Sequence, residues 1–259
     1  MRHIMESHSQ VVCMDENSAY KVLADPSKLK MVLKKYSAKS YVGFKIPRWT
    51  EQLEWDVLSD LPTDLDYPGK ATRFYDSQPL IFMLRDPRDV VCSMLRYKVP
   101  GGVWIDVAGR PILAHKAMQR GDFRDKYAKE LTYVILAHDH RVAAGALYWK
   151  YKTESLFEYQ AKRLPLLVVR YEELCQQPEL VMHRVVEFLG LEWENTLVAP
   201  ESVLHRDLDS SGDPISEERL SRGIEAKSVG QYASILTADQ LDDIKNITGD
   251  VAPRLGYRL

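Results

Sequence analysis

Arg85 and Ser93 have the residue types and the spacing that phosphate binding needs. Arg85 directly follows the apolar run Pro79–Leu84 (PLIFML), and Ser93 comes eight residues later, about two turns into a predicted helix at 3.6 residues per turn. A guanidinium, a hydroxyl and the amino end of a helix can together hold a phosphate. The alternative is structural: Arg85 pairs with Asp86 or Asp89, and Ser93 only packs against its neighbours.

The elements around these two residues are predicted by local signals. A continuous apolar run of strand length predicts a strand buried on both faces of a parallel sheet. After it, Asp86 suits an N-cap, Pro87 suits the first helical position, and Asp89 puts a carboxylate in the first turn of a helix that continues over Val90–Tyr97. Strand, turn and helix form half of a β-α-β unit. Arg85 then lies at the carboxyl end of a strand, where parallel sheets bind ligands.

A second unit of the same kind begins at Leu164–Arg170, an apolar strand followed by a helix over Pro178–Leu189 that Gly190 ends. This repetition predicts an α/β fold, a parallel sheet flanked by helices, in one domain over residues 1–259. Further predicted elements are helices at Ala24–Tyr36 and Thr237–Ile247, two helices within Asp122–Lys162, short strands at Val11–Cys13 and Tyr41–Lys45, and a loop at Pro100–Pro111.

The composition is that of an ordinary globular protein, with 259 residues of which 45% are hydrophobic and 28% charged. A net charge of −2 is unlike the basic excess of nucleic-acid binders, so we expect no nucleic-acid partner. No apolar run approaches the roughly 18 residues of a membrane helix, and the first residues lack the apolar core of a signal peptide. We therefore expect no membrane association and a cytoplasmic location. The oligomeric state stays open.

Four blocks of the sequence resemble a known family. Residues 84–95 (LRDPRDVVCSML) resemble the 3′-phosphate-binding motif of sulfotransferases that use 3′-phosphoadenosine 5′-phosphosulfate (PAPS). The other similar segments are 169–174 (VRYEEL) with 187–190 (EFLG), 43–48 (GFKIPR), and 228–232 (SVGQY) with 255–257 (LGY). Residues 1–16 resemble the stretch that follows the 5′-phosphosulfate loop in tyrosylprotein and related bacterial sulfotransferases. The resemblance implies a fold like that of P-loop nucleotide hydrolases.

The resemblance implies a role for each matching position. Arg85 and Ser93 would bind the 3′-phosphate, and Tyr171 would lie against the adenine. Lys45 would balance the charge that builds on the bridging oxygen, and Glu16 falls on the position of the catalytic base. The alternatives are a core tyrosine at 171, a solvated lysine at 45, and an N-cap or surface acid at 16.

The C-terminal block departs from the family pattern in one respect. The family often has Gly-x-Trp followed by a basic residue, whereas this chain has Gly230-Gln231-Tyr232-Ala233. Gly230 matches the glycine of the cofactor-binding block, and Tyr232 can replace an aromatic wall, but Ala233 cannot replace a cation. The basic residues close enough in sequence to serve the 3′-phosphate instead are Lys227 and Arg222 and, after Ser93, Arg96 or Lys98.

A larger departure concerns the first strand and its phosphate loop. Family members begin with a buried strand and a basic-Ser-Gly-Thr-Thr loop whose backbone N–H groups hold the 5′-phosphosulfate. In this comparison Met1 falls just past the end of that loop, so we expect the fold to lack both. Three explanations stay open: a fragment or mis-started reading of a complete enzyme, a sheet that has closed up and binds nucleotide weakly, or a partner that supplies the missing part.

The expected activity is sulfonyl transfer from PAPS to a hydroxyl or amine of a small-molecule, carbohydrate or peptide acceptor, with no metal. The alternative is a non-catalytic module that binds nucleotide or protein, and a P-loop kinase relative is disfavoured because no Walker lysine can be placed. The segment His138-Asp139-His140 has metal-ligand residue types, but no further ligand occurs at a supportive spacing.

Overall fold

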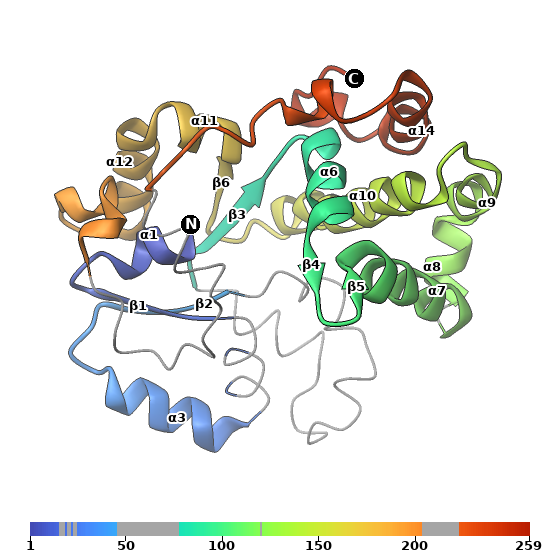
Figure 1. The fold of residues 1–259 in the computed structure, drawn as a ribbon. Coiled ribbons are helices and arrows are strands. Elements are labelled where there is room, and N and C mark those ends of the chain that lie inside the picture. Colours follow the sequence, from blue (N-terminus) through green and yellow to red (C-terminus); the bar gives the residue numbers. More distant parts are fainter. Residues whose placement is uncertain (16–18, 20–21, 23–24, 46–77, 120, 204–222) are drawn as a thin grey trace. The chain divides into compact units, whose positions relative to one another are not determined.

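The structure is a computed structural model that describes residues 1–15, 19, 22, 25–45, 78–119, 121–203 and 223–259. The chain divides into two compact units (Figure 1). The first unit consists of Met1–Met83 and Tyr159–Ala226, and the second consists of Leu84–Glu158 and Lys227–Leu259. Each unit has its own cluster of buried hydrophobic side chains. The predicted single domain stays a prediction.

Two pairs of hydrogen-bonded strands organise the first unit. Strands β1 (Val11–Met14) and β2 (Tyr41–Phe44) run parallel, and β3 (Leu80–Leu84) is hydrogen-bonded to β6 (Leu166–Arg170). Figure 1 shows α3 on one side of the β1–β2 pair and α1 on the other. The helices of this unit include α1 (Arg2–Glu6), α3 (Pro26–Lys35), α11 (Tyr171–Gln176) and α12 (Pro178–Leu189), with 3-10 turns at Asn195–Leu197 and Pro200–Ser202.

Local signals in the sequence set the ends of these helices. The Asp25 side chain accepts hydrogen bonds from the backbone N–H groups of Ser27 at 2.9 Å and Lys28 at 3.3 Å, so it caps α3. Gly190 ends α12 in the left-handed conformation with φ of 64°, where a side chain would be strained. The core of the unit is formed by Ile4, Val11, Val169, Val181 and Met182, among others.

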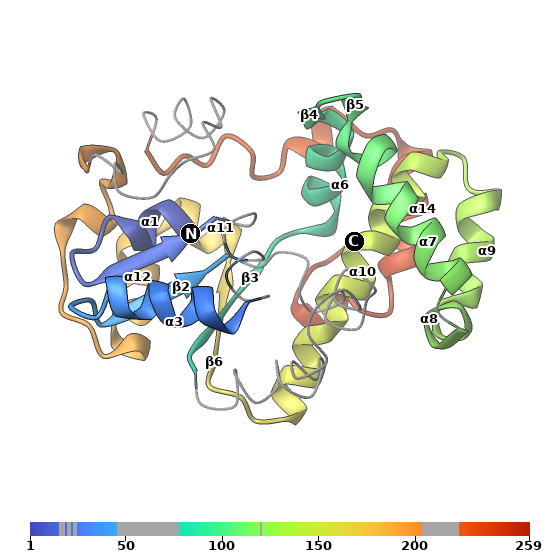
Figure 2. The same cartoon turned by 90° about the horizontal axis from the view of Figure 1, so that it is seen from below.

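The second unit is helical. Its elements are α6 (Pro87–Arg96), the hairpin β4 (Lys98–Val99) and β5 (Gly102–Val103), a π-helix at Ile105–Gly109, α7 (Arg110–Gln119), α8 (Gly121–Lys126), α9 (Ala128–Leu136), α10 (His140–Ala161, of which residues 159–161 are assigned to the first unit), α14 (Ala238–Thr248), and 3-10 turns at Gln231–Ser234 and Pro253–Leu255. Figures 1 and 2 show α7, α9 and α14 beside α10. Its core combines side chains from these helices.

Helix α10 packs closely against α6 because it has a run of small residues. Ala143, Ala144 and Ala146 are buried. At Gly145 an added Cβ would lie 3.3 Å from Cγ2 of Val91 in α6, which is tighter than ordinary van der Waals contact. The absent side chain lets the two helices approach, and α6 contains Ser93, one of the two residues that the sequence analysis assigned to phosphate binding.

The structure corrects several sequence-based predictions. Residues 100–111 are not a loop, since they contain the turn and second strand of the β4–β5 hairpin, the π-helix and the start of α7. Gly101 and Gly102 have φ of 91° and 146°, so these glycines form a tight turn rather than an open loop. Ile105, which is fully buried, anchors the segment. Between residues 122 and 162 three helices occur instead of two, because α8 and α9 are separate.

The remaining predicted strands and helices are confirmed within one to three residues at their ends where the structure describes them. The two-sided burial predicted for 79–84 is wrong: Leu84 is buried, but the Met83 side chain is 37% exposed. The α/β fold class is confirmed, with parallel strands and flanking helices. Among the described residues, no helix has both the length and the apolar character needed to cross a membrane.

Candidate functional site

Arg85 is held at both its backbone and its side chain by other residues of the second unit. Its Nη2 donates a hydrogen bond to the backbone carbonyl of Ser228 at 2.6 Å. Its own carbonyl accepts a hydrogen bond from the indole Nε1–H of Trp149 at 2.9 Å. Trp149 is buried, and its ring meets Tyr257 edge-on. The contact to Ser228 joins Arg85 to a segment that lies 143 residues further along the chain.

The start of α6 is fixed by Asp86 and Arg88. Asp86 accepts a hydrogen bond from the backbone N–H of Arg88 at 2.8 Å, which confirms it as the N-cap. Nε and Nη2 of Arg88 donate hydrogen bonds to the two carboxylate oxygens of Asp86, at 3.0 and 2.6 Å. This pairing raises the pKa of Arg88 above its usual value. The same guanidinium lies 4.0 Å from the centroid of the Tyr232 ring, close enough for a cation–π contact.

Asp89 ties α6 to the C-terminal block. This residue is 1% exposed, and its two carboxylate oxygens accept hydrogen bonds from the backbone N–H groups of Gly230 at 2.7 Å and Tyr232 at 3.1 Å. Gly230 has φ of 73°, a left-handed conformation that favours glycine. The turn at Gly230 directs these N–H groups toward Asp89, so residues 228–232 lie along α6.

Ser93 lies on the same face of α6 as Asp89, since residues four apart on a helix are neighbours. The Ser93 side chain is exposed, so its hydroxyl is open to a ligand. One turn later, Nη1 of Arg96 donates a hydrogen bond to Oε1 of Gln231 at 3.4 Å. The guanidinium of Arg96, the hydroxyl of Ser93 and the turn at Gly230 thus lie along one face of α6. Groups of these kinds can bind the phosphate of a nucleotide.

The other predicted site residues are distributed between the two units. Lys227 is exposed and directly precedes Ser228 in the second unit. Lys45, exposed after β2, and Tyr171, half-buried at the start of α11, belong to the first unit. Glu16 lies outside the described residues. The structure therefore joins the Arg85–Ser93 block directly to Gly230, whereas the roles of Lys45, Tyr171 and Glu16 stay predictions.

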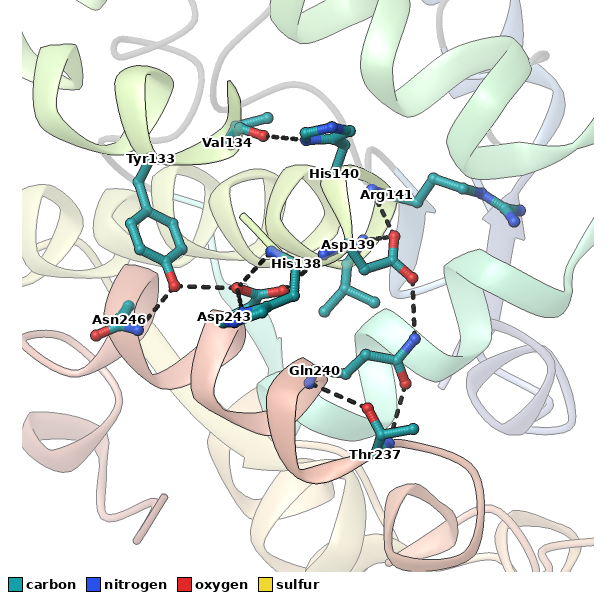
Figure 3. Close-up of polar contacts among 11 residues, drawn as sticks. Tyr133, Val134, His138, Asp139, His140, Arg141, Thr237, Gln240, Asp243 and Asn246 are labelled. Atoms are coloured by element: carbon teal, nitrogen blue, oxygen red, sulfur yellow. Dashed lines mark hydrogen bonds and ion pairs between the residues drawn. The ribbon is translucent and has the colours of Figure 1, made fainter. Parts of the chain in front are cut away.

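The segment 138–140 serves the packing of helices (Figure 3). Nδ1 of His138 contacts Oδ1 of Asp243 in α14 at 3.2 Å, and Nδ1 of His140 contacts the Val134 carbonyl at 2.7 Å. Asp139 accepts a hydrogen bond from the backbone N–H of Arg141 at 2.9 Å, at the start of α10. The three side chains have different partners, and in the described part of the chain no metal-ligating side chains group in threes.

Two positioning residues were missed by the sequence analysis. Trp149 had no role assigned from the sequence, and its hydrogen bond to the backbone carbonyl of Arg85 was not anticipated. Asp89 was considered as a first-turn carboxylate and as a possible partner of Arg85, and its contact with the backbone of Gly230 was not anticipated. The one usable signal for the second contact was the glycine itself, because a glycine often marks a left-handed turn.

Solved structures share this fold. The "Sulfotransferase Domain from the Curacin Biosynthetic Pathway" aligns over 90% of this chain and 68% of its own, with a TM-score of 0.53 and 14% identity. The "Sulfotransferase Domain from the Synechococcus PCC 7002 Olefin Synthase" aligns over 90% of this chain and 64% of its own, with a TM-score of 0.53 and 16% identity. At this identity the two likenesses concern the fold alone, which is that of a sulfotransferase domain.

The family model described as "Sulfotransferase domain" matches residues 74–254, a range that includes Arg85, Ser93, Tyr171 and Gly230. The chain therefore belongs to the sulfotransferase family, and the predicted family is confirmed.

Curated relatives agree with this assignment. A putative protein-tyrosine sulfotransferase of Caenorhabditis briggsae is 23% identical over 185 residues, which is 71% of this chain and 52% of that protein. Protein-tyrosine sulfotransferase 2 of Gallus gallus is 29% identical over 93 residues, 35% of this chain and 25% of the relative. The matched part thus spans about half of the first relative and about a quarter of the second. The predicted absence of the first strand and phosphate loop stays a prediction.

Proposed function

We propose that this chain binds PAPS and transfers its sulfonyl group to a hydroxyl or amine acceptor. The observation that supports the proposal most is the junction of two family blocks in one site: Arg85 bonds to Ser228, and Asp89 bonds to Gly230. Both blocks resemble cofactor-binding segments, and the range that matches the family includes both. Their contact supports a single anion site for the 3′-phosphate.

Arg85 and Ser93 anchor the nucleotide in this proposal. A guanidinium can donate two parallel hydrogen bonds to phosphate oxygens, and a hydroxyl can donate a third. Hydrogen bonds to a charged group contribute about 1.5–3 kcal/mol each. Arg85 binds a neutral carbonyl at Ser228, and this contact orients a guanidinium that has five N–H donors in all. Lys227 adds a further positive charge beside the segment, and Tyr171 stacks against the adenine.

The transfer step requires a base and a counter-charge. The acceptor oxygen attacks sulfur and forms the new S–O bond, while the bond from sulfur to the bridging oxygen breaks. The electron pair of that bond stays on the 5′-phosphate of the product, 3′-phosphoadenosine 5′-phosphate (PAP), and the acceptor proton goes to Glu16. Lys45 balances the charge on the leaving oxygen, and positioning together with this electrostatic stabilisation provides most of the catalysis.

The acceptor we propose is the hydroxyl of a peptide tyrosine, because the curated relatives are named protein-tyrosine sulfotransferases. A carbohydrate or a small alcohol is the competing class. A panel with a tyrosine peptide, its phenylalanine counterpart and a simple sugar separates these classes, since the phenylalanine peptide retains every group except the acceptor oxygen.

Calorimetry and a turnover assay test the proposal. The chain is titrated with PAP and with AMP, which lacks only the 3′-phosphate, and is then incubated with radiolabelled PAPS and the acceptor panel. Preferential binding of PAP, lost in Arg85→Ala, together with transfer of label to an acceptor supports the enzyme. Binding of PAP without transfer supports the non-catalytic binding module instead. If PAP and AMP bind equally or not at all, the proposed nucleotide site is wrong.

A further inference from the structure

We propose that helix α3 binds the surface of an anionic lipid bilayer through its exposed lysines. This inference does not depend on the proposed function, because it concerns a helix to which no site residue was assigned. The binding surface, which we call the lysine face, consists of Lys28, Lys30, Met31, Lys34 and Lys35. All five residues are exposed to solvent, and the sequence of α3 contains no acidic residue.

The first argument concerns the two sides of α3. Leu29, Val32 and the C-cap residue Tyr36 follow one another at spacings of three and four residues and are half-buried, so they line one side of the helix. Figure 1 shows α3 beside the β1–β2 pair. Met31 and Lys34, three residues apart, lie on the other side, and Met31 is 69% exposed. Such exposure is unusual for a methionine, so the lysine face presents an apolar group among its charges.

The second argument concerns charge. Lys30 and Lys34 form no ion pair with the residues that the structure describes. Lys28 pairs with Asp25 at 3.3 Å, but both side chains are exposed, and exposed ion pairs are weak. Charges at a protein surface act within a Debye length of about 8 Å at physiological ionic strength. The lysine face therefore attracts anions, although the net charge of the whole chain is −2.

The third argument distinguishes a bilayer from a protein or a nucleic acid as the partner. Protein interfaces are depleted in lysine and enriched in arginine and aromatic residues, and arginine provides the planar, two-point recognition of a carboxylate or phosphate. The basic residues of α3 are all lysines. The apolar Met31 gains nothing from a nucleic-acid backbone, whereas on a bilayer it inserts below the headgroups while the lysine ammonium groups stay among them.

This inference changes the expectation about membranes. The sequence analysis expected no membrane association because no apolar run is long enough to span a bilayer. A helix that lies on the bilayer surface needs no such run, since only one of its faces reaches the headgroups. Each lysine close to an anionic leaflet strengthens binding about fivefold. The four lysines of α3 therefore predict a reversible association that depends on salt, not a permanent anchor.

The experiment measures co-sedimentation of the full chain with vesicles of phosphatidylcholine alone and of phosphatidylcholine and phosphatidylserine in equal parts. We expect binding to the anionic vesicles only, and release by added salt. Lys30→Gln combined with Lys34→Gln should weaken this binding about 10- to 30-fold, and Met31→Ser about 2- to 5-fold. Lys129→Gln combined with Lys245→Gln removes two exposed lysines of the second unit and should bind as the unsubstituted chain does. Melting temperatures verify that the variants fold.

Three outcomes overturn the inference. Equal binding to both kinds of vesicle, or binding to neither, would show that α3 does not recognise anionic lipid. Undiminished binding by the Lys30 and Lys34 double variant would assign the lipid contact to another surface. If the chain binds labelled polyglutamate through these two lysines but not the anionic vesicles, the partner is an acidic protein. Calorimetry with PAP on the same variants separates this inference from the proposed function, because substitutions in α3 should leave PAP binding unchanged.

Discussion

The carboxylate of Asp89 accepts a hydrogen bond from the backbone N–H of Gly230 at 2.7 Å, across 141 residues of sequence. Asp89 is 1% exposed, so this bond forms away from solvent. A buried carboxylate that receives N–H donors is a strong and specific connection. It fixes the C-terminal block to the helix that contains Ser93, and this connection makes the candidate site testable by substitution.

The first prediction concerns this connection. Asp89→Asn removes the charge and turns an amide N–H₂ toward one of the N–H donors of Gly230 and Tyr232. We expect it to lower the free energy of unfolding by about 1–3 kcal/mol and to reduce PAP binding, because residues 228–232 lose their position. Chemical denaturation and calorimetry measure both effects. The control is Asp239→Asn, at an exposed position in the first turn of α14. It should lower the free energy of unfolding by about 1 kcal/mol or less. Equal stability of the Asp89 variant and the unsubstituted chain would contradict this prediction.

The second prediction concerns the Ser93 hydroxyl. Because the side chain is exposed, Ser93→Ala should change the free energy of unfolding by about 0.5 kcal/mol or less. We expect PAP binding to weaken about 10- to 100-fold, as for the loss of one hydrogen bond to a charged group, with AMP binding unchanged. Calorimetry with both nucleotides measures this, and AMP serves as the internal control. An equal loss for both nucleotides would place the serine away from the 3′-phosphate.

The third prediction concerns the close approach of α10 to α6. At Gly145 an added Cβ meets Cγ2 of Val91 at 3.3 Å and Sδ of Met94 at 3.6 Å. Gly145→Leu should therefore destabilise the chain by about 1–3 kcal/mol through overpacking, measured by thermal or chemical unfolding. At Gly121 the nearest group is the flexible end of Arg124 at 3.8 Å, so Gly121→Leu should be tolerated. Equal effects of the two substitutions would contradict the packing described here.

The fourth prediction concerns pH. A hydrogen bond to the buried Asp243 carboxylate raises the pKa of His138, an effect that desolvation opposes and that Asp239 and Asp242 reinforce (Figure 3). Since the folded pKa is above the unfolded value of about 6.5, protonated His138 stabilises the fold below that pH, and the contribution is lost as the pH rises through the folded pKa.

His138→Gln should accordingly lower the melting temperature more at about pH 6 than at about pH 9. His140→Gln is the control, because the His140 ring contacts the neutral carbonyl of Val134. Thermal unfolding of the three proteins at both pH values measures the difference. If His138→Gln lowers the melting temperature equally at both pH values, the pair of protonated His138 and Asp243 does not contribute to stability.

Much of the fold was predictable because its signals are local. Asp86 and Pro87 mark the start of α6, and Gly190 marks the end of α12, since caps and turns depend on residues within a few positions. The β4–β5 hairpin over residues 98–103 was missed for the opposite reason. Its glycines are compatible with either a loop or a tight turn, and the burial of Ile105 decided between them.

The sequence by itself determined the family and the strand, turn and helix that present Arg85 and Ser93, because cap, proline and apolar pattern act over short distances. Only the tertiary structure decided which residues support them: the Trp149 indole for the backbone of Arg85, and Asp89 for the turn at Gly230. The physical reason lies in the donors and acceptors. Backbone carbonyl and N–H groups are the same in nearly every residue, so the sequence does not specify which partner they bind. Packing decides this when it brings distant segments together.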